Sequence, residues 1–90
     1  METHYAYALS SLNRNYIYKG MSADVIKRFH RHNSGHEKTT KPYRPFILIY
    51  SQEFDSRELA REKEVYLKSP NGREELKKLK NTFQVLSNNK

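Results

Sequence analysis

The chain contains no cysteine, which excludes a disulfide scaffold and a zinc site built on thiolates. It also fits a reducing compartment, so we expect a cytoplasmic protein. Apolar runs are short: the longest, Phe46–Tyr50, is far below the roughly 20 residues that a membrane helix needs. The amino terminus lacks a basic segment followed by an apolar one, so no signal peptide is expected. These absences predict a soluble protein with no membrane contact.

Several common catalytic motifs are also missing. The sequence has no glycine-rich phosphate loop, no His-Glu-x-x-His zinc motif and no Gly-x-Ser-x-Gly nucleophile elbow. Internal repeats and low-complexity segments are absent too. The histidines do not make a compact ligand set, because residues two apart on a helix do not share a face. They are His4, His30, His32 and His36.

What the chain does have is an excess of positive charge. Its 90 residues contain 17 Lys and Arg against 10 Asp and Glu, a formal net charge of +7. A length of 90 residues predicts a single domain, which we place at residues 1–86, followed by a frayed tail at 87–90. Small basic domains commonly bind a polyanion, and nucleic acid is the commonest one.

Two tyrosine-rich segments near the amino terminus alternate as β-strands do. In His4–Ser11 the larger side chains, among them Tyr7, fall on one face and two alanines fall on the other. The alanine face predicts that a helix packs closely there. In Tyr16–Lys19 the tyrosines, including Tyr18, again share a face, and the short Asn-containing loop between the segments predicts a hairpin. We expect Gly20 to end it, where the backbone turns sharply or approaches a ligand.

A basic helix is expected after the hairpin. Ser22 can cap it, and an apolar stripe at helical spacing follows. Arg28 and His32 are four residues apart, so they lie on one side of the helix. Gly35 provides a left-handed end.

The second half of the chain predicts one strand and two helices. Phe46–Tyr50 is a continuous apolar run, which favours a central strand buried on both faces. A capping box at Asp55 opens a helix to about Lys68, and a last basic helix is expected at Arg73–Lys80. The polar loop at 36–45 should lie on the surface. The predicted fold is a small three-stranded antiparallel sheet flanked by helices, in the order β-β-α-β-α-α.

The hairpin resembles the start of a GIY-YIG nuclease domain. Tyr5-Ala6-Tyr7 occupies the first tripeptide of that family and Tyr18-Lys19-Gly20 the second, with the family's spacing of ten residues between them. The first tripeptide keeps only its last tyrosine, and Lys19 replaces an apolar residue in the second. The chain is most similar to the short stand-alone members, which are related to the amino-terminal nuclease domain of the excision-repair endonuclease.

The resemblance continues to the helix at 55–68. Arg28 falls where the family has its helix arginine, and His32 matches a histidine of several branches. An alanine four residues before Glu64 selects that residue, rather than Glu62, as the family's metal-binding glutamate. Helical spacing agrees, because it puts Glu64 at the boundary of core and solvent.

The resemblance implies a metal-dependent endonuclease that hydrolyses phosphodiester bonds, with DNA as the expected substrate, of the repair or recombination kind. Glu64 would hold a single Mg²⁺ or Mn²⁺, and Arg28 would bind the scissile phosphate. Tyr7 or Tyr18 would orient or deprotonate the water, with His32 or Lys19 as the nearby cation or acceptor that a tyrosine needs. The catalytic candidates are therefore Tyr7, Tyr18, Arg28, His32 and Glu64.

Basic and hydroxyl side chains around these positions are expected to contact the nucleic acid. They are Lys19, Gly20, Arg31, Lys38, Thr39, Thr40, Lys41, Arg44 and Lys68. The partner is expected to be DNA, with RNA an open alternative, and the protein a monomer or weak homodimer. Two other interpretations stay open: a nucleic-acid-binding module of the same fold that has lost catalysis, and a small basic protein-interaction domain.

Overall fold

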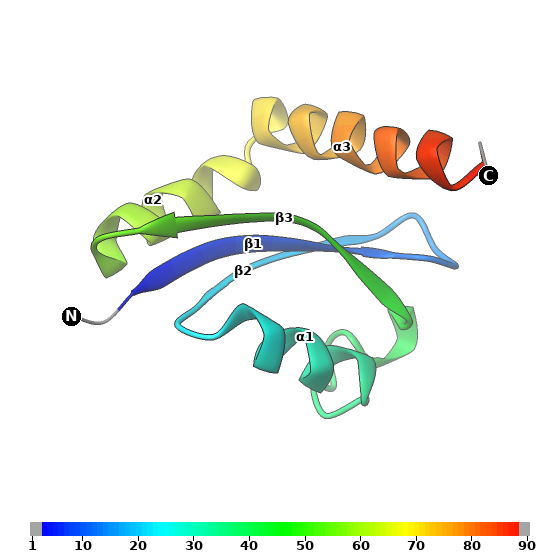
Figure 1. The fold of residues 1–90 in the computed structure, drawn as a ribbon, viewed down its shortest axis with the longest axis horizontal. Helices are drawn as coiled ribbons and strands as arrows, with labels where there is room; N and C mark the ends of the chain where they lie inside the picture. Colours follow the sequence, from blue (N-terminus) through cyan, green and yellow to red (C-terminus); the bar gives the residue numbers. More distant parts are fainter. Residues whose placement is uncertain (1–2, 89–90) are drawn as a thin grey trace.

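A three-stranded antiparallel sheet lies between one helix on one face and two helices on the other (Figure 1). The computed structural model describes residues 3–88, with side chains as far as Phe83. The elements are β1 (His4–Ser11), β2 (Ile17–Ser22), α1 (Val25–Asn33), the short 3-10 helix η1 (Lys41–Tyr43), β3 (Phe46–Phe54), α2 (Arg57–Leu67) and α3 (Pro70–Asn88). This order confirms the predicted fold class. Within the described residues, no helix is both long and apolar enough to cross a membrane.

The central strand is β1, and the prediction that Phe46–Tyr50 is central was wrong. The strand order is β2-β1-β3, with β1 antiparallel to both neighbours. The apolar run is continuous because β3 contributes to both layers: Phe46 packs into the α1 side and Ile49 into the side of α2 and α3. A strand can thus be buried on two faces while its backbone lies at the edge of the sheet.

The two faces of β1 build two different cores. Tyr7 and Leu9 pack with Val25 of α1, whereas Ala8 packs with Leu67 and Leu76 of α2 and α3. The prediction that a helix covers the alanine face is confirmed. Small side chains let α2 approach the sheet, and burying a leucine there contributes about 1.5–3 kcal/mol.

The helix ends differ from the prediction in two places. Asp24, not Ser22, caps α1, because its Oδ1 accepts the Lys27 amide at 3.0 Å. The α3 helix begins at Pro70 instead of Arg73, since proline needs no donor at a first helical position. Gly72 lies inside α3 because a Cβ there would collide with the backbone of the last turn of α2.

Two other predicted boundaries concern a turn and the tail. Gly35 has a φ of +80°, which confirms the predicted left-handed end after α1. At the carboxyl end, α3 continues to Asn88, and the rest of the predicted frayed tail lies outside the described residues.

Candidate active site

Tyr7 lies at the centre of the polar cluster on the α1 face. Its side chain is fully buried, and its partner across the β1–β2 ladder is Gly20. A Cβ built on Gly20 would lie 3.0 Å from the Cζ and hydroxyl oxygen of Tyr7 and 2.8 Å from a ring carbon of Tyr18. Gly20 therefore sits within β2, where it makes room for two tyrosine rings, and the prediction that it ends the hairpin was wrong. Because it is itself buried, its position favours placing the tyrosines over contacting a ligand.

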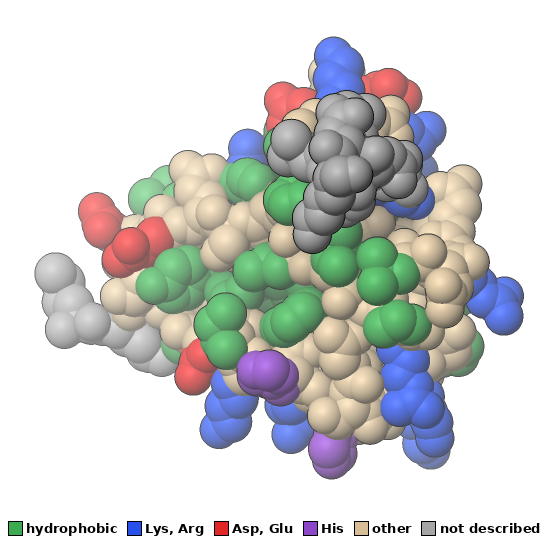
Figure 2. Space-filling view, turned by 45° about the vertical axis from the view of Figure 1, so that its right-hand side comes forward, with side chains coloured by type: hydrophobic (Ala, Val, Ile, Leu, Met, Phe, Trp, Pro, Cys, Tyr) green, Lys and Arg blue, Asp and Glu red, His purple; other side chains and the backbone are tan. Residues whose placement is uncertain are grey.

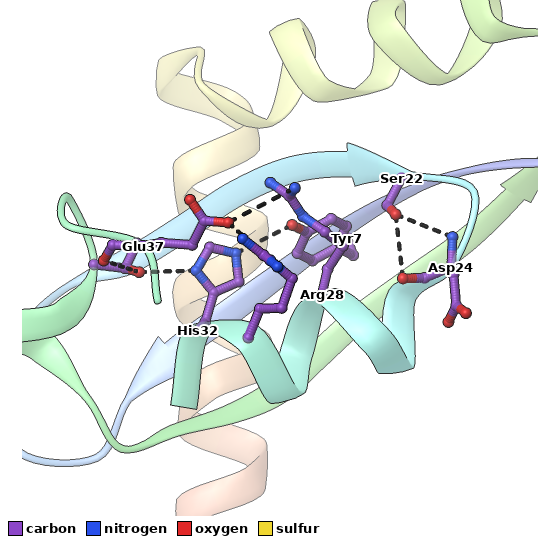
Figure 3. Close-up of polar contacts among 8 residues, drawn as sticks. Tyr7, Ser22, Asp24, Arg28, His32 and Glu37 are labelled. Atoms are coloured by element: carbon purple, nitrogen blue, oxygen red, sulfur yellow. Dashed lines mark hydrogen bonds and ion pairs between the residues drawn. The ribbon is translucent and has the colours of Figure 1, made fainter. Parts of the chain in front are cut away.

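The α1 helix brings Arg28 and His32 to Tyr7 from one side (Figure 3). Both side chains point towards the Tyr7 hydroxyl, as their spacing of four residues predicts. The hydroxyl lies 3.3 Å from Nε2 of His32, which is 1% exposed. The Tyr18 ring packs 4.6 Å from the His32 ring and 6.1 Å from the Tyr7 ring, measured between centroids. Four of the five predicted catalytic residues thus form one cluster.

Arg28 is held in place by Glu37, a residue that sequence reasoning did not select. Nη1 of Arg28 lies 3.8 Å from Oε1 of Glu37, and Nε of Arg31 lies 3.3 Å from the same oxygen. Nε of Arg28 is buried without a hydrogen-bond partner. The available signal was a single acidic residue within the basic loop at 36–45.

Thr40 is in a different place from the one predicted. It was expected on the surface as a phosphate contact, but it is fully buried, with its hydroxyl 2.8 Å from Nδ1 of His32. The loop reaches the interior because η1 begins at the next residue and turns the backbone under α1.

The remaining basic residues of this side are exposed. Arg31, Lys38, Thr39, Lys41 and Arg44 all lie at the surface. In Figure 2, lysine, arginine and histidine side chains gather along the lower margin, where α1 and the following loop lie in Figure 1. A phosphate backbone could reach this margin without any change in the fold.

The three central groups shift one another's ionisation. Burial raises the pKa of the Tyr7 hydroxyl to about 12 from its usual 10.0, although Arg28 acts in the opposite direction. Burial also lowers the pKa of His32, and the Arg28 guanidinium adds to that shift. The nearby Tyr7 hydroxyl raises the pKa of Arg28. Near neutral pH the cluster therefore holds a neutral tyrosine, a neutral imidazole and a guanidinium cation.

Glu64 lies on the other face of the sheet, on α2. It shares a stripe with Ala60 and Leu67, which are 0% and 1% exposed, so it points towards the sheet. Its side chain is 16% exposed, and Nζ of Lys68 lies 3.7 Å from its Oε2. The described residues contain no group of three or more His, Cys, Asp or Glu side chains that could hold a metal. A metal at Glu64 would therefore have this carboxylate as its protein ligand and water or substrate for the rest.

A second group of cations lies along β2. Lys19, Lys68 and Arg73 line a shallow pocket of about 310 Å³ together with residues 16–18. Burial lowers the pKa of Lys19, and the charges of Arg73 and Lys68 add to that shift. Nζ of Lys19 donates to the Ile17 carbonyl at 3.1 Å, which leaves His32 as the contact of Tyr7. Arg73 was missed because the sequence offers no reason to associate α3 with β2.

Comparisons with known proteins agree with this arrangement. Residues 3–80 match the family model described as the GIY-YIG catalytic domain. The chain is 33% identical over 78 residues to the UPF0213 protein SSP2268 of Staphylococcus saprophyticus, covering 86% of this chain and 94% of that one. It is also 33% identical over 91 residues to the UPF0213 protein VPA1222 of Vibrio parahaemolyticus, covering 98% and 86%.

The fold also resembles a solved structure. The solution NMR structure of the UPF0213 protein BH0048 from Bacillus halodurans matches with a TM-score of 0.51 and 34% identity, covering 87% of this chain and 85% of that one.

Proposed function

The chain belongs to the GIY-YIG family of catalytic domains, and from that premise we propose that it is a metal-dependent endonuclease that hydrolyses phosphodiester bonds in DNA. The family is one of nucleases that generally use divalent metal ions. The observation that carries the proposal is the buried Tyr7 hydroxyl, which lies within reach of an imidazole acceptor and a guanidinium. Hydrolysis needs these three functions: water activation, proton removal and charge relief on phosphate.

Arg28 is the proposed phosphate ligand. A guanidinium can donate two parallel hydrogen bonds to phosphate oxygens, and its charge stabilises the charge that develops on them. The buried, unpaired Nε supports this role, because a planar Arg side chain offers Nε and one Nη together. In the free protein Glu37 occupies the Nη1 side of Arg28. An incoming phosphate would compete with that carboxylate and draw the guanidinium away from Tyr7.

Tyr7 is the proposed general base, in preference to Tyr18, since its hydroxyl has the imidazole partner. A pKa of about 12 means that only about one Tyr7 in 10⁴ is ionised at pH 8. A preformed tyrosinate is therefore too rare to be the working base. Tyr7 must take the water's proton while passing its own proton to Nε2 of His32.

Glu64 is the proposed metal ligand. A single carboxylate suits Mg²⁺ or Mn²⁺, because Mg²⁺ keeps several water ligands and is completed by substrate phosphate. The Lys68 ammonium supports this role, since the carboxylate of Glu64 already pairs with a cation in the free protein. When bound, the metal would supply Lewis-acid stabilisation of phosphate charge.

The two halves of the proposed site can meet at the edge of the sheet. Glu64 and the Tyr7 cluster approach the sheet from opposite faces, but β2 is an edge strand and Gly20 within it has no side chain. A phosphate held along this edge could be reached by Arg28 from one face and by Glu64 from the other.

The nucleic acid is proposed to follow the two groups of cations. One group comprises the exposed residues of α1 and the loop, where Arg31 and Lys41 lie, and the other comprises Lys19, Lys68 and Arg73 at β2. A polyanion spanning both groups would cross the edge of β2. Its affinity should fall steeply as salt rises.

A nicking assay tests the proposal. Wild-type protein with Mg²⁺ or Mn²⁺ should cut supercoiled DNA, and Glu64→Ala should abolish cutting while leaving salt-dependent DNA binding intact. The matched control is Glu62→Ala, an exposed glutamate on the same helix, which should retain activity. Binding without cleavage of DNA or RNA by the wild type would favour a decayed binding module. Absence of both would favour a protein-interaction domain.

A further inference from the structure

The hydroxyl of Thr40 makes a buried contact that the proposed function does not use. It is enclosed completely and lies 2.8 Å from Nδ1 of His32, the nitrogen that faces away from Tyr7. It lies also 3.4 Å from the backbone carbonyl oxygen of Glu37, to which it can donate. Buried polar groups are normally hydrogen-bonded, so the direction of each bond in this chain follows from the hydrogens available.

The directions can be assigned starting from Tyr7. Its hydroxyl has one hydrogen to place, and Arg28 beside it can only donate, so Nε2 of His32 is the acceptor. A neutral imidazole that accepts at Nε2 carries its hydrogen on Nδ1. Nδ1–H then donates to the Thr40 oxygen, and the Thr40 hydrogen points to the Glu37 carbonyl. All donors and acceptors in the chain are satisfied in this one direction.

We propose that Thr40 is a positioning residue that holds His32 in the Nδ1–H tautomer, so that the bare Nε2 faces Tyr7 as a proton acceptor. The carbonyl of Glu37 fixes the direction of the Thr40 hydroxyl and thereby makes Thr40 an acceptor towards His32. The same residue holds Arg28 through its side chain, so one loop position supports both the imidazole and the guanidinium.

In the reaction, which rests on the proposed endonuclease function, each proton has a stated place. The attacking water gives a proton to the Tyr7 oxygen as its own oxygen bonds to phosphorus. The Tyr7 hydroxyl proton moves to Nε2, which leaves an imidazolium whose Nδ1–H stays on Thr40. The phosphodiester bond to the leaving oxygen breaks, that oxygen takes a proton from solvent, and the imidazolium returns one to solvent.

The tautomer can be measured without any substrate. Imidazole nitrogen NMR of the free protein should show His32 with a protonated Nδ1 and an unprotonated Nε2. Thr40→Ser, which keeps the hydroxyl, should give the same pattern. Thr40→Val, which has nearly the same shape but no acceptor, should shift the population towards Nε2–H. A wild-type His32 protonated on Nε2, or a Thr40→Val protein with an unchanged tautomer, would overturn the assignment. The wild-type spectrum decides the assignment even if Thr40→Val does not fold.

Kinetics of the metal-loaded enzyme provide the second readout. Thr40→Val should lower kcat by at least about tenfold with little change in KM, because a misdirected base removes part of general-base catalysis. Thr40→Ser should restore most of that loss. Equal kcat values for wild type and Thr40→Val would refute the positioning role. A wild type that cuts nothing would instead reject the proposed function, and the NMR result would still decide the tautomer.

Discussion

The raised pKa of Tyr7 makes the stability of the protein depend on alkaline pH. In the unfolded chain the hydroxyl ionises near 10.0, and in the folded protein at about 12. The folded state therefore keeps its proton over a range in which the unfolded state loses it. Stability from this group is fully present below pH 10 and is lost as pH rises towards 12. Two pKa units correspond to about 2.7 kcal/mol in total.

At about pH 11, halfway through this range, the loss should be about 1.4 kcal/mol. The matched variant is Tyr7→Phe, which keeps the ring in the core and removes the titrating group. Urea unfolding of both proteins should be measured at about pH 8 and pH 11. Other lysines and tyrosines titrate in both proteins, so only the difference between the two counts. Wild type should lose about 1.4 kcal/mol relative to Tyr7→Phe on this change of pH.

A second variant separates burial from simple tyrosine chemistry. Tyr66 donates to Glu75 at the surface, where solvent screens the interaction, so Tyr66→Phe should change the pH dependence much less. If wild type and Tyr7→Phe lose equal stability between the two pH values, the Tyr7 hydroxyl ionises as it would in water. The argument that Tyr7 needs His32 to accept its proton would then be wrong.

Three further outcomes follow from the same contacts. Glu37→Gln should tighten DNA binding several-fold in a fluorescence titration, because it frees Arg28; an equal gain from Glu62→Gln would show a mere effect of net charge. Since the pKa of His32 is lowered on folding, stability should fall as pH drops below about 6.5, and urea unfolding at pH 7.5 and 5 should show less of this fall for His32→Gln. Gly20→Ala should lower kcat by displacing the Tyr7 and Tyr18 rings, at a cost of about 1–3 kcal/mol of unfolding free energy; full activity would show that the close approach is unimportant.

The sequence predicted local features well because each has a local physical cause. Alternation revealed the two faces of β1, and a spacing of four residues put Arg28 and His32 on one side of α1. The strand order was missed, since an apolar run reports burial of side chains but not pairing of the backbone. The same limit hid the start of α3, where Gly72 depends on contact with another helix.

Long-range contacts account for the rest of the site. Thr40 was predicted as a surface residue because its neighbours are polar, yet one turn of η1 carries its hydroxyl to His32. Glu37 stood out only by its charge, and its pairing with Arg28 depends on the path of the loop. Neither contact has a sequence signal of its own, whereas the tyrosine spacing and Glu64 were recognisable through family resemblance.

The central claim is that residues on opposite faces of the sheet serve one reaction. The most direct test is a double-mutant cycle under single turnover with wild type, Tyr7→Phe, Glu64→Gln and the double variant. Groups that act as a unit are strongly non-additive, so the double variant should be about as slow as the slower single variant. Rate losses that multiply across the two positions, or single variants as fast as wild type, would contradict a shared site.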